Sequence, residues 1–409
     1  MLRVLLVCLL IQFCAPALAQ GREQAERQFA AWLEQVIWPR ARSAAVSRVT
    51  FDEALGGVAL DWDLPGLERT GPQAPQQHFQ AEFDAPGRYF AARTVEATTQ
   101  AGRRMARRHA AVLARVERQT GVPGRIILAI WGRESAYGSV AIPHDAFAVL
   151  ATKGFLDRRG DYFAGELVAA LKIAEAGLAP PGAMKSSWAG AMGQPQFLPS
   201  SYLDHAADGD GDGRADIWRS DADTIASIGN FLARHGWVRG RDWGFEVTVP
   251  DSVSCTLEGP RRGRAIRDWE AMGIRRVSGR PFPAHERQGD GFLLMPAGRL
   301  GPAFIVTPNF YVLKDYNKSD LYALFVGHVG DRIQFGLGDF AGQWRTSGTL
   351  RRGDIAFIQR ALRERGYAIN RVDGLAGVAT RRAIGEWQQA TGRKASCFFE
   401  PAMRAALGG

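Results

Sequence analysis

The chain has 409 residues, enough for two or three domains with a large apolar core. Its hydrophobic fraction of 46% and charged fraction of 23% are ordinary for a globular protein. The net charge of +9 favours an anionic surrounding, although a general arginine bias would give the same charge. No dense basic block is interleaved with aromatic residues, so nucleic acid is disfavoured as a partner.

The N-terminus predicts export. Arg3 precedes an apolar run over 4–13 and an Ala-x-Ala site that ends at Ala19, so residues 1–19 are a predicted cleavable signal peptide. The run is too short to span a membrane as a helix. Cys8 and Cys14 follow residues that make a poor lipoprotein site, so a lipid anchor is only a minor alternative. We expect a soluble periplasmic protein.

The mature chain keeps two cysteines, Cys255 and Cys397. In an oxidising compartment they could form a disulfide. They lie far apart in the sequence and in different predicted domains. Pairing is therefore disfavoured, although it stays open.

The first part of the chain is predicted to be helical. Apolar residues recur at helical spacing over 21–39, and shorter helices are expected over 41–49 and from a cap at Thr50. A stretch rich in Pro, Gly and Gln over 66–86 predicts a loop. An amphipathic helix follows over 101–119, before Gly121 and Pro123, which suit the end of one helix and the start of the next.

Glu134 lies in the last turn of the apolar helix that follows Pro123. Apolar walls would disfavour the charged form of its carboxyl, which suits a general acid at neutral pH. The alternative is a Glu that caps a core helix or pairs with Arg133. This stretch alone favours that alternative, since structural ion pairs are common.

Two further helices, over 146–152 and 161–177, lead to a run over 187–202 that is dense in Gly, Gln and Ser. The run fits neither a helix nor a strand. Loops in which the backbone must approach closely often line sites, and an ordinary tight connection is the alternative.

The segment from Asp208 to Asp216 matches the start of a calcium-binding loop, with acidic residues at positions 1, 3, 5 and 9 and Gly at 6. Position 12 is Arg219, so Asp221 or Asp223 would have to supply the last ligand. Three close carboxylates repel one another without a cation, so we expect a structural Ca²⁺ ion. A solvated acidic turn is the alternative.

The last part of the chain changes character twice. After a helix over 224–235, alternating residues predict a small β subdomain over about 243–310. A helix over 319–329 and a Gly-containing linker over 336–349 follow. The last sixty residues predict a separate unit with three helices, over 354–365, 379–391 and 401–407.

Four segments together resemble the lytic murein transglycosylase B family. They are Trp131-Gly132-Arg133-Glu134-Ser135, the run Ala189–Tyr202, the acidic loop Asp208–Trp218 and Tyr316-Asn317-Lys318-Ser319. The resemblance covers about 25–335, in the family's order. The tail, with Val372-Asp373-Gly374, Thr380-Arg381 and Trp387-Gln388, resembles a small peptidoglycan-binding domain.

The resemblance implies a mainly α fold. Residues 20–340 would form a lysozyme-like helical catalytic body, into which the β subdomain over about 243–310 is inserted. A linker and a three-helix domain would follow over 341–409. It implies non-hydrolytic cleavage of the β-1,4 bond between N-acetylmuramic acid (MurNAc) and N-acetylglucosamine (GlcNAc), which leaves a 1,6-anhydromuramic end. It implies no organic cofactor. The implied partners are peptidoglycan strands and other cell-wall enzymes, and we expect a monomer.

The resemblance also assigns residues. Glu134 matches the catalytic acid and base, and Arg133 is expected to point away from it. Residues implied to line the saccharide site are Ser187, Gln196, Tyr316, Asn317, Tyr322, Tyr89, Tyr162 and Phe231. The implied calcium ligands are Asp208, Asp210, Asp212, the Arg214 carbonyl and Asp223, although an apparent one-residue insertion leaves Asp223 in doubt.

The chemistry agrees with this assignment. Ordinary glycosidases use two carboxylates, whereas here only Glu134 lies in a suitable context. One carboxyl group suffices if the C6 hydroxyl of the substrate is the nucleophile. The alternatives are a hydrolytic muramidase and a non-catalytic wall-binding scaffold.

Overall fold

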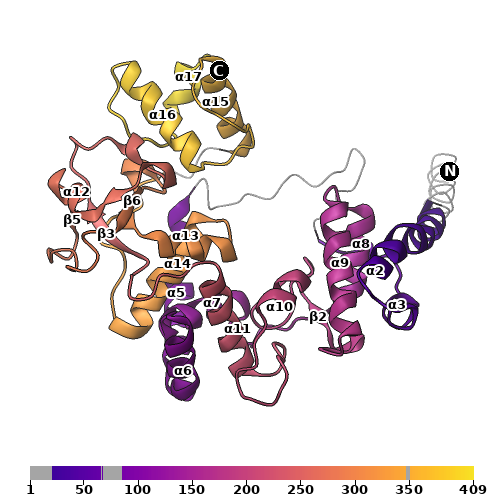
Figure 1. Ribbon diagram of the computed structural model, residues 1–409. Coiled ribbons are helices and arrows are strands. Elements are labelled where there is room, and N and C mark those ends of the chain that lie inside the picture. Colours follow the sequence, from indigo (N-terminus) through magenta and orange to yellow (C-terminus); the bar gives the residue numbers. More distant parts are fainter. Residues whose placement is uncertain (1–20, 66, 68–84, 347–350) are drawn as a thin grey trace, which may run out of the picture. The chain divides into compact units, whose positions relative to one another are not determined.

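The computed structural model describes residues 21–65, 67, 85–346 and 351–409. They form two compact units, the first from 1–75 and 138–227 and the second from 76–137 and 228–409 (Figure 1). The predicted signal peptide and most of the loop predicted over 66–86 lie outside the described residues.

The described part of the first unit is mainly helical and includes one short antiparallel strand pair, in which His144 pairs with Ser186. Helices α8 and α9 pack along each other, and α3 and α10 pack on α9. The elements are a helix over 21–32, the π-helix η1 (Leu33–Ile37), α2 (Trp38–Ser43), α3 (Arg48–Leu55), β1 (His144–Asp145), α8 (Ala146–Leu156), α9 (Gly160–Glu175), the 3₁₀ turn η3 (Pro181–Ala183), β2 (Lys185–Ser186), α10 (Pro199–His205) and the start of α11 (Asp221–Arg234).

The helix predicted over 41–49 is wrong. The chain leaves α2 after Ser43, and Ala45 has a positive φ of 63° that no helix can continue through. Ser47, rather than Thr50, caps α3, because its hydroxyl accepts the backbone N–H of Thr50 at 3.2 Å.

The helical body of the second unit is built on α5, α7 and α14, which pack against one another. The helix predicted over 101–119 is in fact two helices, because the chain leaves helical geometry at His109. Pro123 is the N-cap of α7 rather than its first residue. The elements are the 3₁₀ turn η2 (Pro86–Phe90), α5 (Ala92–Arg108), α6 (Ala110–Thr120), α7 (Gly124–Ser135), the end of α11, α13 (Pro308–Tyr316) and α14 (Asp320–Phe335).

The predicted β subdomain forms one antiparallel sheet with the strand order β4-β6-β7-β3-β5. Phe245 pairs with Ile305, which in turn pairs with Leu293, so three buried side chains lie across neighbouring strands. Its elements are β3 (Gly244–Thr248), η4 (Cys255–Leu257), η5 (Pro260–Arg262), β4 (Arg264–Ala265), α12 (Ile266–Ala271), β5 (Arg275–Arg276), β6 (Asp290–Leu294), η6 (Gly298–Leu300) and β7 (Ala303–Val306).

Three C-terminal helices follow, drawn in yellow in Figure 1: α15 (Arg352–Glu364), α16 (Val378–Ala390) and α17 (Ala402–Ala406). Their apolar core includes Ala297, which precedes η6 in the β subdomain. The part of the predicted linker that is described packs on the body. The carboxylate of Glu246 accepts the backbone N–H groups of Ala341 and Gly342, and the Trp344 ring stacks on Phe90.

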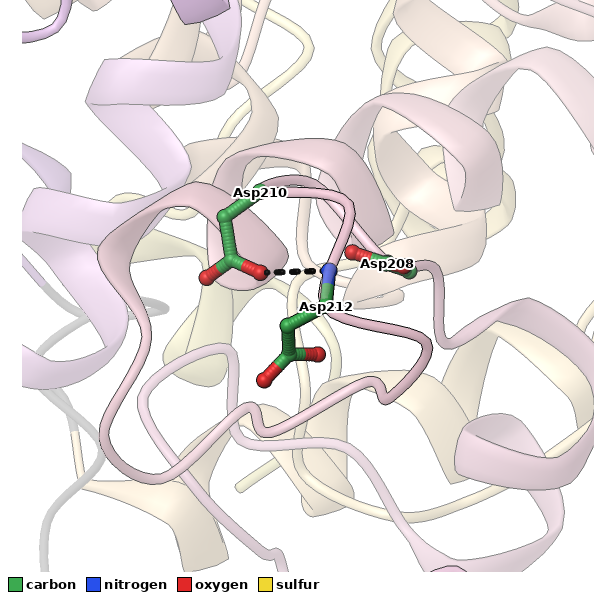
Figure 2. A group of neighbouring side chains, drawn as sticks. All are labelled: Asp208, Asp210 and Asp212. Atoms are coloured by element: carbon green, nitrogen blue, oxygen red, sulfur yellow. Dashed lines mark hydrogen bonds between the residues drawn. The ribbon is translucent and has the colours of Figure 1, made fainter.

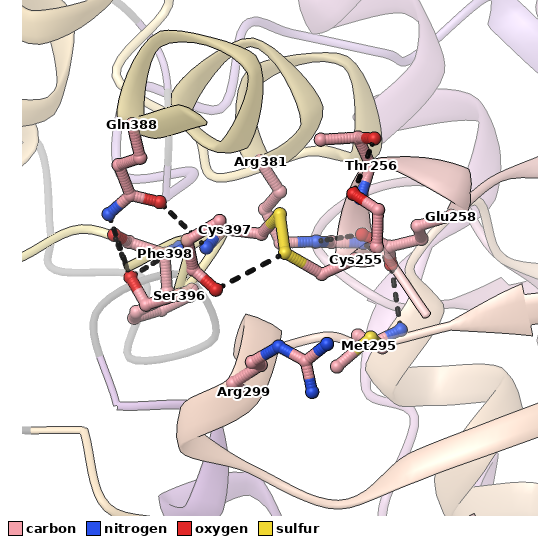
Figure 3. Close-up of a disulfide and its surroundings, with 12 residues drawn as sticks. Cys255, Thr256, Glu258, Met295, Arg299, Arg381, Gln388, Ser396, Cys397 and Phe398 are labelled. Atoms are coloured by element: carbon pink, nitrogen blue, oxygen red, sulfur yellow. Dashed lines mark hydrogen bonds and ion pairs between the residues drawn. A yellow bond between two sulfur atoms is a disulfide. The ribbon is translucent and has the colours of Figure 1, made fainter. Parts of the chain in front are cut away.

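A disulfide joins Cys255 of η4 to Cys397, at a sequence separation of 142 (Figure 3). The expectation that disfavoured this pairing was wrong, because α16 packs directly on η4 and brings the two cysteines together. Cys397 also belongs to the core of the β subdomain. The predicted fold class, a helical body with a small β subdomain and three C-terminal helices, is confirmed.

Candidate active site

Helix α7 carries Glu134 from the middle of the second unit. Every residue from Gly124 to Gly132 is buried, so α7 is surrounded by protein along most of its length. Trp131 is 0% exposed, whereas Arg133 is exposed and Glu134 is half-buried. The helix therefore presents its carboxyl group at the end of a rigid apolar support.

The carboxyl group of Glu134 accepts a hydrogen bond from the hydroxyl of Tyr322 on α14, at 2.5 Å. Burial raises the pKa of Glu134 to about 7, and the Tyr322 hydrogen bond and the Arg133 charge only partly oppose this rise. Because Tyr322 occupies Oε1, the proton of the neutral acid belongs on Oε2. The group can therefore both give and take a proton near neutral pH.

Aromatic rings continue from Tyr322. The Tyr316 ring stacks parallel to it with 6.4 Å between centroids, and Phe231 of α11 lies 4.7 Å from Tyr316. Asn317 is exposed, and its side-chain oxygen accepts the backbone N–H of Ser319. The structure thus groups four residues predicted from sequence with Glu134: Tyr316, Asn317, Tyr322 and Phe231.

Arg133 turns toward Tyr89. Its guanidinium donates to the Tyr89 hydroxyl at 2.9 Å and lies over the rings of Tyr89 and Phe325 at 4.6 and 5.1 Å. The guanidinium thus lies against aromatic rings, and its charge lowers the pKa of Glu134 less than burial raises it. Tyr89, which the resemblance assigned to the saccharide site, is thereby held beside the Glu134 turn.

Tyr137 fixes the chain just after Glu134. Ala136 and Tyr137 both have positive φ, 47° and 60°, in which residues with a side chain are strained. The Tyr137 hydroxyl donates to the Thr98 carbonyl of α5 at 2.9 Å. A Cβ at Gly132 would lie 2.5 Å from that hydroxyl oxygen, so only glycine leaves it room.

The remaining predicted saccharide residues lie in the first unit. Met192 forms β-bridges with both Ser186 and Phe197. Ser187 is the residue after the first of these partners, and Gln196 is the residue before the second. Gln196 has a positive φ of 55°, and its amide donates to the Gly193 carbonyl. Tyr162 is 46% exposed on α9.

The first unit also contains the acidic loop. Asp208, Asp210 and Asp212 each offer an oxygen within 4.8 Å of the others, and all three are exposed (Figure 2). Asp223 is 1% exposed, and its two oxygens accept the N–H groups of Gly209 at 2.7 Å and Asp216 at 2.6 Å. Asp223 therefore joins the two ends of the loop.

Sequence reasoning missed the ionic contacts that hold the start of the helix that carries Tyr322. Asp320, the first residue of α14, accepts from Lys314 of α13 and from Arg381 of α16. Lys314 lies close enough in sequence to have been suggested as a partner. Arg381 lies 61 residues away, and no local pattern predicts it.

Known families match most of the chain. The family described as "Transglycosylase SLT domain" matches residues 28–331, and the family described as "Putative peptidoglycan binding domain" matches residues 351–407. The first match includes Glu134 with every residue predicted to line the saccharide site.

Individual relatives agree. The crystal structure of SltB3 from Pseudomonas aeruginosa in complex with NAG-anhNAM-pentapeptide is 35% identical with a TM-score of 0.84, over 93% of this chain and 99% of that one. The Escherichia coli lytic transglycosylase Slt35 in complex with calcium is 31% identical with a TM-score of 0.50, over 58% of this chain and 75% of that one. Membrane-bound lytic murein transglycosylase B of E. coli K12 is 34% identical over 214 residues, which span 52% of this chain and 57% of that relative.

Proposed function

Since the chain belongs to the lytic murein transglycosylase family, we propose that it cleaves the β-1,4 bond between MurNAc and GlcNAc with one carboxyl group, that of Glu134. The family and enzyme class predicted from the motifs are confirmed. The observation that carries the mechanism is the half-buried Glu134, with its pKa at about 7 and Tyr322 on one oxygen.

In the proposed reaction, neutral Glu134 gives its proton to the glycosidic oxygen as the bond from MurNAc C1 to that oxygen breaks, and GlcNAc leaves with a free hydroxyl. The C6 hydroxyl oxygen of MurNAc then bonds to C1, and its proton passes to the Glu134 carboxylate. The acid is thereby regenerated and no water is consumed. The product is a 1,6-anhydromuramic end.

The surroundings of Glu134 support a single carboxylate. Among the described residues, its one hydrogen bond comes from Tyr322. The nearest acidic residue along α14 is Asp320, whose two oxygens are taken by Lys314 and Arg381. A two-carboxylate mechanism needs a second group free to act as nucleophile or to activate water.

Product analysis tests the proposal. Wild type and Glu134→Gln are incubated with purified sacculi, and the new glycan ends are identified by mass spectrometry. We expect anhydromuramic ends from wild type and essentially none from Glu134→Gln, which keeps the shape of the side chain but cannot transfer a proton. Reducing muramic ends would instead identify a hydrolytic muramidase, and equal cellular function of both proteins would identify a scaffold.

A structural calcium ion is proposed for the acidic loop. Three carboxylates within 4.8 Å of one another suit a hard cation that prefers oxygen ligands. Asp208, Asp210 and Asp212 would hold it with the Arg214 carbonyl. Asp223 braces the loop through Gly209 and Asp216, and its oxygens keep lone pairs, so it is retained as the proposed last ligand.

Calcium removal should lower the melting temperature, because an ion that binds only the folded chain stabilises it by mass action. Thermal melts in calcium are compared with melts in excess chelator, and Mg²⁺ is the ionic control. Asp210→Asn, at an exposed position, should reduce the calcium-dependent shift. An unchanged melting temperature in chelator would refute the site.

The other predicted roles stay proposals that rest on the resemblance. Ser187, Gln196 and Tyr162 in the first unit, and Tyr89, Phe231, Tyr316, Asn317 and Tyr322 in the second, would contact sugar rings and N-acetyl groups. A periplasmic location and a monomeric state are proposed with them. Among the described helices, none has both the length and the apolar character required to cross a membrane.

A further inference from the structure

A buried ionic cluster joins the C-terminal helices to the body of the second unit. Arg381 of α16 has a side chain only 4% exposed. Its guanidinium donates twice to Glu258, at 3.0 and 2.6 Å, and once to the Ala376 carbonyl at 2.6 Å. Figure 3 shows Arg381 and Glu258 beside the disulfide.

The same guanidinium reaches α14. Its Nη2 donates to Oδ2 of Asp320 at 3.2 Å, while Lys314 of α13 donates to Oδ1 at 2.6 Å. Burial would raise the pKa of Asp320, but these two cations outweigh it and hold the pKa below its usual range. An ionised Asp320 at the start of α14 is therefore held by residues of two other helices, α13 and α16.

The ion pair between Lys314 and Asp320 brackets the proposed site residues in the sequence. Tyr316 and Asn317 lie between these two residues, and Tyr322 comes two residues after Asp320. Asn317 bonds the N–H of Ser319, and the Ser319 hydroxyl caps α14 by accepting the N–H of Tyr322 at 3.2 Å. The connection from α13 to α14 is only three residues long, so the N-terminus of α14 has little freedom once Asp320 is held.

We infer that Arg381 is a positioning residue for the catalytic acid: through Asp320 it fixes the first turn of α14 and thereby the Tyr322 hydroxyl that bonds Glu134. The inference rests on the proposed function, in which Glu134 is that acid. It gives the C-terminal helices a part in catalysis in addition to any part in polymer binding.

The choice of side chain fits this role. A planar guanidinium can hold Glu258 through two parallel bonds while a remaining N–H faces Asp320. A lysine is a point charge and would lose that fixed geometry. The catalytic effect would be felt on any substrate, including one too short to reach the C-terminal helices.

The test uses the full-length protein and a soluble tetrasaccharide of alternating GlcNAc and MurNAc. One variant combines Arg381→Met with Glu258→Gln, so that neither partner is left as a lone buried charge. A second, Asp320→Asn, removes the carboxylate charge that Arg381 and Lys314 both hold. The matched control is Gln389→Ala on the same helix, which loses a bond to Ser254 and leaves Asp320 untouched.

We expect kcat to fall roughly ten- to a hundredfold in both test variants, with KM within about twofold, because small displacements of a catalytic group act on the transition state. The alkaline limb of the kcat profile should move to higher pH, since the Tyr322 bond lowers the pKa of Glu134. Gln389→Ala should keep wild-type kcat and the wild-type limb.

If folded Asp320→Asn keeps the wild-type kcat and the wild-type alkaline limb of the kcat profile, the inference is overturned. If the double variant does not fold, the result for Asp320→Asn is the test of the inference. Equal losses in Gln389→Ala would also overturn it, because the effect would then be general to the attachment of the helices. Anhydro products from wild type together with an inactive Glu134→Gln keep the proposed function intact in either case.

Discussion

At the scale of single residues, the proposed mechanism depends on a carboxyl group whose pKa is raised by its surroundings. Burial raises the pKa of Glu134 from 4.5 to about 7, and the Tyr322 hydroxyl stabilises the charged form only in part. Near neutral pH the acid and its conjugate base are then both populated. This titration matches the proposed role of Glu134, which has to give and then take a proton.

Stability should therefore depend on pH through Glu134. Its pKa is higher in the folded than in the unfolded chain, so its contribution is fully present below about pH 4.5 and is lost as pH rises through about 7. The loss is roughly 3 kcal/mol for a shift of this size. The melting temperature of Glu134→Gln minus that of wild type should therefore be larger at about pH 8 than at about pH 4.5. Thermal melts of both proteins at the two pH values measure this change.

A constant difference in melting temperature between the two proteins across that range would contradict the raised pKa.

In wild type, kcat should fall above pH about 7, because the first step needs the protonated acid. The resemblance predicted site roles for Glu134 and several tyrosines, but it did not predict that Tyr322 bonds the carboxyl of Glu134 or that Arg133 lies over Tyr89. Those contacts depend on how α7, α14 and η2 meet.

At the scale of elements, the end of α7 is held by a close packing of helices. The Tyr137 hydroxyl lies between α5 and α7, where Gly132 leaves it space and the Thr98 carbonyl accepts its hydrogen bond. This contact supports Ala136 and Tyr137, two residues of strained backbone that follow Ser135. The position of the turn that carries Glu134 thus depends on the absence of a side chain at Gly132.

Gly132→Ala should destabilise the fold by about 1–3 kcal/mol and lower activity, because the new methyl group would meet the Tyr137 hydroxyl at 2.5 Å. Gly165→Ala on α9 is the matched control, since a Cβ there meets nothing within 4 Å. It should be neutral or stabilising by up to about 1 kcal/mol. Urea unfolding of both variants measures the difference, and equal effects would contradict the packing argument.

Sequence periodicity predicted most helices and three strands within a few residues, because burial of one face produces a regular pattern. It failed where a single residue interrupts that pattern. His109 divides one amphipathic stretch into α5 and α6, and Ala45 ends α2 before the residues that looked helical. Such breaks are decided by neighbouring elements rather than by local preference.

At the scale of the whole molecule, long-range pairings were beyond prediction. Cys255 and Cys397, and Glu258 and Arg381, lie 142 and 123 residues apart. The two cysteines lie far apart in the sequence and in different predicted domains, and this argued against pairing. Only the packing of α16 on η4 shows that these domains share an interface with a disulfide and a buried ion pair.

Loss of the disulfide should cost roughly 2–5 kcal/mol, since it closes a long loop in the unfolded chain. Urea unfolding of wild type with and without reductant, beside a Cys255→Ala/Cys397→Ala variant, measures this cost. Reduced wild type and the variant should unfold at similar, lower urea concentrations. A wild-type midpoint that reductant does not move would contradict the expectation.

The attachment of the C-terminal helices also has a geometric consequence. A domain on a free linker would search a volume set by linker length, whereas here the described part of the linker, the disulfide and Arg381 hold α16 within the same unit as Glu134. If these helices bind a glycan strand, the distance between the binding site and the cleaved bond is constant. The fragments released from one strand should then cluster around a preferred number of disaccharides.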